Sequence, residues 1–262
     1  MAFYGLATGI SSQNYANNKG LDHVFEVRIC RSLARRLSLQ CVVILLLRLY
    51  QGQTGQFLVR QALQQGHMVT AVVRTPSKLT NNHDNLKIVE ANIFSANSLT
   101  EHFVDQDVVI SCLGFPISII SQITEYTESM KAIVASMRQA KVNRVIAMTS
   151  WYTQTESAEN ASWMVRWMLI PIIRNILKNM HEMEDYLKQE CDDLDWTTVR
   201  PPALKTAPET DEEIITYDGY FVPDQHGNPI TNSVTRGDVA RFILSQLTVD
   251  TWVKKSVAIV TK

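Results

Sequence analysis

The feature that most constrains the fold is a glycine-spaced turn between an apolar run and a helical pattern. Residues 41–47 form the apolar run, Gly-Gln-Thr-Gly occupies 52–55, and residues 56–65 have helical spacing. A strand, tight turn and helix in this order present backbone N–H groups and the positive end of a helix to a phosphate group. The pattern therefore predicts a dinucleotide site at the start of an α/β fold.

This glycine motif lacks its first member. The full spacing G-x-x-G-x-x-G requires glycines at 49, 52 and 55, but position 49 is Leu49. A leucine side chain there, with Tyr50 beside it, takes up space where the chain bends toward the phosphates. Two interpretations therefore remain: Gly52 and Gly55 hold a pyrophosphate, or they only make a tight turn.

The second predicted strand indicates which dinucleotide binds. Residues 69–73 are apolar and end at Arg74. A basic side chain at this place suits the 2′-phosphate of NADP, whereas an acidic one would bind the ribose of NAD. We therefore expect NADP(H) as cofactor. The alternative is that Arg74 is a solvated charge at the end of a strand.

Strand and helix patterns alternate through the rest of the chain. Further predicted strands are residues 86–90, 107–112, 144–148, 196–200 and 256–260, and the predicted helices are residues 98–103, 123–140, 163–188 and 236–247. Apolar strands separated by helices indicate a parallel sheet covered on both faces, with its ligand at the carboxyl ends of the strands. The predicted fold class is α/β, a doubly wound parallel sheet of the Rossmann type in a single domain. Gly114, Ser150 and Pro201 follow such strands.

We assign residues 41–262 to this NAD(P)-binding domain and residues 1–40 to a divergent N-terminal extension. The extension contains Arg28, Arg31, Arg35 and Arg36 and lacks strand alternation. An arginine-rich start can be a mitochondrial presequence, but acidic residues in the same segment disfavour that interpretation.

Composition narrows the function classes. The chain has 262 residues and a formal net charge of -1, which gives no electrostatic footprint for nucleic acid. Its four cysteines lack C-x-x-C spacing, as expected for free thiols in a reducing compartment, so we expect a cytoplasmic protein.

Residues 163–188 form an unusually apolar helical pattern. We expect a bend at Pro171, which lacks an N–H group, and a helix that covers the sheet and borders the substrate pocket. Arg166, Arg174 and Lys178 interrupt the run, so it is not expected to span a membrane. Trp163 and Trp167 are interpreted as core or lid packing, with a flavin-stacking platform as the alternative.

Six motifs occur in the order found in one known family. They are Gly-Gln-Thr-Gly at 52–55, Val-Val-Arg-Thr-Pro-Ser-Lys-Leu at 72–79, Cys-Leu-Gly at 112–114, Val-Ile-Ala-Met-Thr-Ser at 145–150, Val-Arg-Pro-Pro at 199–202 and Thr-Arg-Gly-Asp-Val-Ala-Arg-Phe at 235–242. With them the chain resembles the atypical short-chain dehydrogenases/reductases of the NmrA-like NAD(P)-binding family, and most closely its biliverdin reductase and flavin reductase branch. The resemblance covers about residue 52 to the C-terminus.

The resemblance implies roles for individual positions. Gly52, Thr54 and Gly55 would contact the pyrophosphate of NADP(H). The 2′-phosphate would be bound by Arg74, Ser77 and Lys78. Asn92 and Ile93 stand near the adenine, where the family commonly has an acidic residue before the aliphatic one. Leu113 and Gly114 would approach the nicotinamide, with Ser150 across from it as the catalytic residue. Ala203 replaces a histidine of the mammalian reductases, so the contribution of that imidazole is absent.

The chain lacks the usual acid of short-chain dehydrogenases. That acid is a tyrosine four residues before a lysine, and the one match, Tyr15 with Lys19, precedes the cofactor strand. Hydride transfer to an acceptor that handles its own proton fits this absence, and flavins, tetrapyrroles and quinones are such acceptors. Ser150 would then orient a planar small molecule, or it only satisfies backbone groups at the strand end.

Other interpretations remain open. His181, with Glu182 and Glu184 close by in sequence, could suggest a metal ligand set, but the spacing favours a solvated helix face and we predict no metal site. The second function is a non-catalytic NADP-binding regulator or redox sensor of the NmrA-like type, with cofactor binding weakened by the missing glycine. Oligomeric state is not predicted, although a monomer is compatible with a reductase of this kind.

Overall fold

The computed structural model describes residues 42–47, 53–73, 83–230 and 233–262, all within the unit that begins at Gln40. These residues contain an eight-stranded sheet in the order β3-β2-β1-β4-β5-β6-β10-β8. In chain order its strands are β1 (Val42–Leu47), β2 (Met68–Val73), β3 (Leu86–Glu90), β4 (Val108–Cys112), β5 (Arg144–Met148), β6 (Asp195–Arg200), β8 (Ile214–Tyr217) and β10 (Lys255–Thr261). Neighbouring strands are parallel, except that β8 runs antiparallel to β10.

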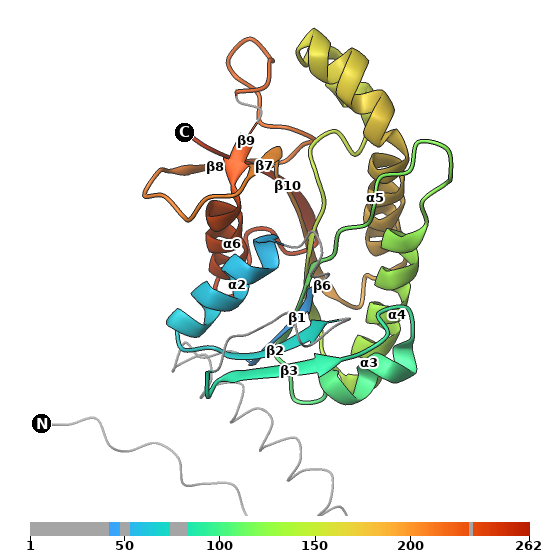
Figure 1. Cartoon of the computed structure of the whole chain (residues 1–262), viewed down its shortest axis with the longest axis vertical. Coiled ribbons are helices and arrows are strands. Elements are labelled where there is room, and N and C mark those ends of the chain that lie inside the picture. The colour runs from blue at the N-terminus through green and yellow to red at the C-terminus, as the bar shows by residue number, and fades with distance from the viewer. Residues whose placement is uncertain (1–41, 48–52, 74–82, 231–232) are drawn as a thin grey trace, which may run out of the picture. The chain divides into compact units, whose positions relative to one another are not determined.

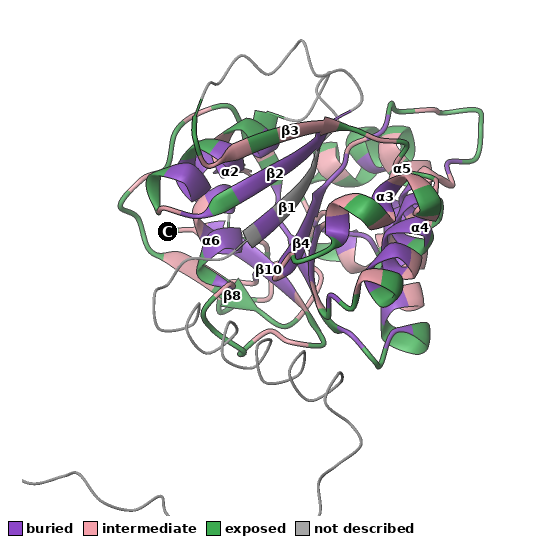
Figure 2. Ribbon diagram, turned by 90° about the horizontal axis from the view of Figure 1, so that it is seen from below, coloured by how far each residue is buried: buried purple, intermediate pink, exposed green. Residues whose placement is uncertain are grey.

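Helices cover both faces of this sheet (Figures 1 and 2). On one face α2 (Gln53–Gln64) packs beside α6 (Arg236–Ser245), and on the other α3 (Ala96–Phe103), α4 (Glu125–Ala140) and α5 (Ile170–Glu190) form a second layer. Each layer closes a hydrophobic core against the sheet, around Leu58 and Ile243 on one side and around Phe103 and Ile133 on the other. The α/β doubly wound class predicted from the alternating pattern is confirmed.

The order of the strands reverses between β1 and β4. From β1 the chain continues to β2 and β3 on one side, and then returns to β4 on the other, with Leu47 opposite Cys112 in the register. Open parallel sheets bind ligands at such a switch point, outside the carboxyl ends of the strands. The candidate site must therefore lie where β1 and β4 end.

The long helical pattern differs from its prediction in one respect. It begins with a π-type turn, Val165–Leu169, which leads into α5, and Pro171 lies in the first turn of that helix. Because Pro171 has no N–H group, the carbonyl of Trp167 loses its α-helical donor. The chain widens there, and the N–H of Ile170 donates to the carbonyl of Val165. No described helix is long and apolar enough to cross a membrane.

The sequence pattern did not predict three short strands and one 3₁₀ segment. They are β7 (Ala203–Lys205), β8, β9 (Ser233–Thr235) and the segment Thr155–Asn160. Residues 211–229 are polar and punctuated by glycine and proline, yet they contain β8, which closes the edge of the sheet against β10. The strands have only three or four residues each, too few to show the alternation that marks a strand in the sequence.

Candidate functional site

The first turn of α2 faces the switch point. The helix begins at Gln53, three residues before its predicted start, so Thr54 and Gly55 belong to the helix and not to the turn, and both are buried. No acidic residue lies in this turn. The N–H groups of a first turn have no partner within the helix, and the helix dipole favours an anion there. This end of α2 can therefore accept a phosphate group.

Leu113 and Gly114 follow β4 directly, beside the carboxyl end of β1. Leu113 is buried, whereas a Cβ built on Gly114 would meet no protein atom within 4 Å. Packing among the described residues therefore does not require a glycine at 114. Close approach of a flat ligand is a physical reason for one.

Asn92 and Ile93 lie after β3, at the same edge of the sheet. The N–H of Phe94 donates to the Asn92 side-chain oxygen (3.1 Å), and the Asn92 N–H donates to the Ser98 hydroxyl (3.0 Å). Asn92 is exposed, and Ile93 packs against the core beside α4. The Asn92 side chain thus stabilises the turn after β3, at the edge where the carboxyl ends of the strands lie.

Ser150 is half-buried just beyond β5. The backbone N–H of its neighbour Thr149 donates to the carbonyl of Val199 (2.8 Å). Within the described ranges the Ser150 hydroxyl takes part in no hydrogen bond. The structure therefore does not support the alternative in which this hydroxyl only binds backbone groups at the strand end. Tyr152, two residues later, has a φ of 60°, a left-handed conformation, and its N–H donates to the Tyr220 carbonyl. This fixed bend directs the chain away from the sheet immediately after the serine.

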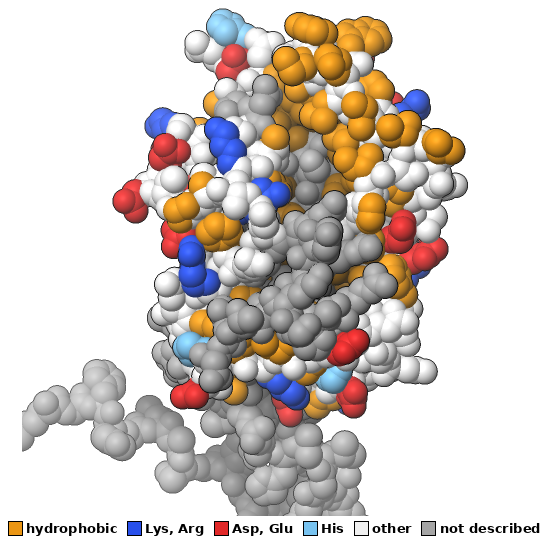
Figure 3. All heavy atoms as spheres, in the orientation of Figure 1, with side chains coloured by type: hydrophobic (Ala, Val, Ile, Leu, Met, Phe, Trp, Pro, Cys, Tyr) orange, Lys and Arg blue, Asp and Glu red, His pale blue; other side chains and the backbone are white. Residues whose placement is uncertain are grey.

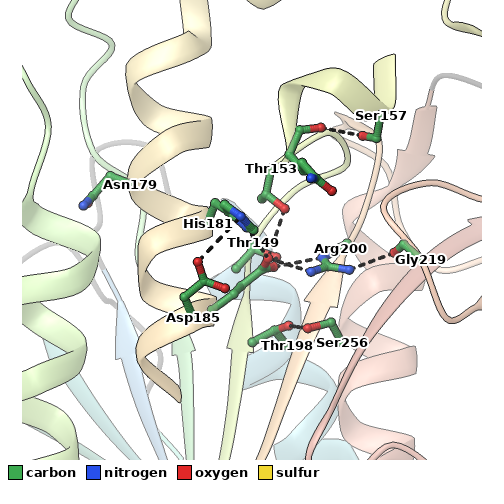
Figure 4. A network of polar contacts seen from close by, with 12 residues as sticks. Thr149, Thr153, Ser157, Asn179, His181, Asp185, Thr198, Arg200, Gly219 and Ser256 are labelled. Atoms are coloured by element: carbon green, nitrogen blue, oxygen red, sulfur yellow. Dashed lines mark hydrogen bonds and ion pairs between the residues drawn. The ribbon is translucent and has the colours of Figure 1, made fainter. Parts of the chain in front are cut away.

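A buried ion pair lies beside the end of β5 (Figure 4). Arg200, at the end of β6, donates from Nε and Nη2 to the two carboxylate oxygens of Glu184 on α5, at 2.9 and 2.7 Å. The hydroxyls of Thr149 and Thr153 donate to the same carboxylate at 2.7 and 3.0 Å, and Arg200 Nη1 donates to the Gly219 carbonyl. Both charged side chains are more than 90% buried. The pair ties α5, β5, β6 and the segment after β8 together.

Electrostatics reinforce this pair. Burial alone would raise the pKa of Glu184, but hydrogen bonds and the charge of Arg200 outweigh it and lower the pKa below 4.5. His181 lies one turn earlier on α5, 3.6 Å from Asp185, and contact with Glu184 and Asp185 raises its pKa above 6.5. The prediction of a solvated helix face is therefore wrong for Glu184. Helical spacing did not reveal that a second element covers it.

Two other titratable groups near the strand ends are held neutral. Burial raises the pKa of Cys112 and the pKa of Tyr152, each to about 12. Neither is an anionic nucleophile at neutral pH, and a pKa this high makes each a weak proton donor. In the parts of the chain that the structure describes, no group of three or more His, Cys, Asp or Glu side chains is arranged as a metal site.

Most of the residues predicted to bind phosphate lie outside the part of the chain that the structure describes. Gly52, Arg74, Ser77 and Lys78 lie there, as do Leu49 at the missing glycine and the pair Tyr15 and Lys19. Their roles remain predictions from the sequence. Among the described candidates, Thr54, Gly55, Leu113, Gly114 and Ser150 all lie on segments that meet the carboxyl edge of the sheet.

Comparison with known proteins identifies the family. A family model described as NAD(P)H-binding matches residues 51–250, which is most of the chain. The chain belongs to this NAD(P)H-binding family. The prediction of a nicotinamide dinucleotide cofactor is thereby confirmed, and the match includes Thr54, Gly114, Ser150 and the Glu184–Arg200 pair.

Solved structures agree with the fold of this NAD(P)H-binding protein. An oxidoreductase of Lactococcus lactis has 19% sequence identity and a TM-score of 0.65, covering 84% of this chain and 91% of its own. A Streptococcus pneumoniae protein proposed to be an NADH-flavin reductase has 18% identity and a TM-score of 0.62 over 85% and 100%. A short-chain dehydrogenase/reductase of Veillonella parvula, in complex with NADP, has 19% identity and a TM-score of 0.60 over 84% and 94%. At such identities the likeness shows the fold.

Proposed function

We propose that this NAD(P)H-binding protein is an NADPH-dependent reductase that delivers hydride to a planar acceptor, namely a flavin, a biliverdin-like tetrapyrrole or a quinone. The observation that carries the proposal is the half-buried Ser150 hydroxyl, which no described residue engages, on the β5 end next to β4 and its Leu113–Gly114 segment. Such a hydroxyl can bind an acceptor or the amide of a cofactor. The likeness to the Streptococcus pneumoniae protein, itself proposed to be an NADH-flavin reductase, supports a flavin among the candidate acceptors.

The cofactor is proposed to bind along the switch point. N–H groups at the start of α2, around Thr54 and Gly55, would donate to its pyrophosphate. Arg74, with Ser77 and Lys78, would bind the 2′-phosphate, and this is the basis for preferring NADPH to NADH. The open space at Gly114 suits a nicotinamide ring lying flat against the backbone. NADPH supplies the hydride when it is bound.

The protein's own contribution is orientation and not proton transfer. The part of the sequence that matches the family has no Tyr-x-x-x-Lys pair, and the raised pKa values of Cys112 and Tyr152, about 12 each, make both groups weak proton donors. Ser150 would hold the acceptor over the nicotinamide, while the Glu184–Arg200 pair keeps the ends of β5 and β6 in place. Solvent would supply the proton. Holding two flat rings in register can provide most of the rate enhancement that such a reaction needs.

Oxidation of NADPH in the presence of FMN, biliverdin or a quinone tests this function. The wild type is expected to oxidise NADPH with at least one of the three, and Ser150→Ala should lower kcat by about tenfold or more while NADPH affinity changes little. Ser157→Ala is the matched control, because that hydroxyl only donates to the nearby Gln154 carbonyl. It should leave kcat unchanged.

The same assay separates the enzyme from a sensor. A chain that binds NADPH tightly but oxidises it with none of the three acceptors would favour the non-catalytic regulator. A loss of activity that is equal in Ser150→Ala and Ser157→Ala would contradict the role proposed for Ser150.

A further inference from the structure

The start of the long helical segment carries an exposed apolar surface. Six large apolar side chains there have exposed fractions between 41% and 68%: Trp163, Met164, Trp167, Met168, Leu169 and Ile172. The loop after β4 adds Ile117, Ile119 and Ile120, and Ile120 is 97% exposed. Asn175 on α5 donates to carbonyls of this loop, at Ser118 and Ser121, so the loop lies against the helix. We call these nine side chains the apolar surface. Figure 3 shows hydrophobic side chains gathered over this region.

The start of the helical segment buries few of its side chains: Ile170 and Leu177 enter a small core cluster, and Val165 and Ile173 pack against it. None of the residues of the π-type turn, Val165–Leu169, is buried. The regular part of α5 then turns Met180, Met183 and Leu187 into the core. Proteins that act alone rarely expose a contiguous apolar patch of more than a few hundred Å², and larger patches mark interaction sites. Trp163 and Trp167 do not pack in the core, since about two thirds of each is exposed, so this part of their prediction is wrong; a role in a lid stays a prediction.

The charged side chains around the apolar surface indicate the chemistry of its partner. From residue 162 to residue 178 the sequence contains Arg166, Arg174 and Lys178 and no Asp or Glu. All three are exposed, and Arg166 lies 5.3 Å from the centre of the Trp167 ring. Lys178 is 3.9 Å from Glu182, whereas no carboxylate of the described chain pairs with Arg166 or Arg174. Tryptophan and aliphatic side chains mixed with unpaired cations are typical of helices that lie in the headgroup region of a membrane.

A second copy of the chain fits this surface less well. A two-fold interface places the same patch on both partners, so it would bring the arginines of one copy near those of the other. The segment contains no carboxylate that could offset this repulsion, and like charges at an interface disfavour association. A bilayer with anionic lipids supplies both an apolar phase and negative charge.

We infer that the apolar surface docks on an anionic phospholipid bilayer. Trp163 and Trp167 would enter the boundary between headgroups and acyl chains, and Arg166 and Arg174 would meet lipid phosphates. The contact is peripheral. It does not rest on the proposed reductase function, because it uses no residue of the cofactor site.

Vesicle binding of the full chain tests this inference. Vesicles of phosphatidylcholine alone and of phosphatidylcholine with phosphatidylserine are compared by flotation and by the shift of tryptophan emission. The wild type should bind the phosphatidylserine vesicles, more weakly at high salt, with its emission moving to the blue. Trp163→Ser combined with Trp167→Ser should weaken binding by about tenfold or more. Arg166→Glu with Arg174→Glu should weaken it by at least about 25-fold, since each basic residue near such a surface contributes about fivefold.

A matched control separates the effect of local contact on vesicle binding from the effect of the protein's net charge. Lys87→Glu with Lys188→Glu makes the same charge change outside the apolar surface and should bind within about threefold of the wild type. Unchanged thermal unfolding would show that each variant folds. The inference is overturned if the wild type ignores phosphatidylserine vesicles or if the tryptophan and arginine variants bind as tightly as it does. A dimer that the tryptophan variant dissociates, without vesicle binding by the wild type, would assign the surface to a second copy.

Discussion

At the scale of single residues, the edge of the sheet contains polar groups with opposite roles. The Ser150 hydroxyl takes part in no hydrogen bond within the described structure, whereas the Glu184 carboxylate accepts from Arg200, Thr149 and Thr153. A buried charge without such partners would cost several kcal/mol. The carboxylate therefore has a structural role, whereas the serine hydroxyl is proposed to bind a ligand.

Replacing Glu184 tests the structural part of this account. Glu184→Gln leaves the buried guanidinium of Arg200 without a counter-charge, so the free energy of unfolding should fall by about 3–5 kcal/mol in urea denaturation. Glu182→Gln is the control, because that residue lies on the same helix and is only half-buried. It should cost less than about 1 kcal/mol. Equal losses in the two variants would show that the buried pair is not important for stability.

Arg200 was the signal in the sequence that could have revealed this pair. It ends the apolar strand at 196–200, and an arginine buried there needs a carboxylate partner. The strand does not indicate which carboxylate, because the partner is distant in sequence and depends on how α5 packs. Gly114 and Ser150 were easier to place, since each comes two residues after an apolar strand, and Thr54 lies within the glycine motif.

At the scale of elements, two glycines serve different purposes. Gly237 lies in the first turn of α6, where a Cβ would come within 2.0 Å of the Glu209 nitrogen and 2.2 Å of the Pro208 carbonyl carbon. These are backbone atoms and cannot rotate away. Gly114 has no such neighbour, so its side of the chain is open.

Alanine substitutions should separate these purposes. Gly237→Ala should lower the free energy of unfolding by about 1–3 kcal/mol, because α6 must move away from the loop. Gly114→Ala should change stability by less than about 1 kcal/mol but weaken NADPH binding. Thermal unfolding and calorimetric titration of both variants measure the two effects. Tight NADPH binding by Gly114→Ala would contradict the proposed position of the nicotinamide.

The elements themselves were predicted unequally from the sequence. The strands β3 and β5 match their predicted bounds of 86–90 and 144–148. A continuous apolar run marks β5 as a strand covered on both faces, whereas β3 lies at the edge of the sheet and is only partly buried. Helix α2 began earlier than predicted, since the helical spacing alone could not show that Gln53 and Thr54 already have helical geometry. The apolar helix at 163–188 was found, but its pattern did not tell which partner its first turns face.

At the scale of the whole molecule, acid should destabilise the fold in a defined range of pH. Burial alone would raise the pKa of Asp238, but hydrogen bonds from Thr210, Thr235 and Arg241 outweigh it and lower the pKa below 3.8. Glu184 is likewise lowered below 4.5. A carboxyl group with a lowered pKa in the folded state stabilises it above the unfolded pKa, and this contribution is lost as the pH falls through the folded pKa.

Denaturation at several pH values measures this effect. The contribution of these two carboxyl groups to the free energy of unfolding should be nearly constant above about pH 5 and should fall steadily as the pH drops below about 4.5. Asp238→Asn should be less stable than the wild type at neutral pH and should lose less on acidification. A variant that loses as much as the wild type between neutral and acid pH would contradict the assignment to Asp238.

The central claim is that this member of the NAD(P)H-binding family uses NADPH, although Leu49 replaces the first glycine of its loop. Calorimetric titration of the full chain with NADPH and NADH, beside the variants Arg74→Ala and Leu49→Gly, tests it most directly. We expect NADPH to bind the wild type more tightly than NADH, with Arg74→Ala removing most of that preference. Binding of NADPH only after Leu49→Gly, or equal affinity for the two dinucleotides in the wild type, would contradict the claim.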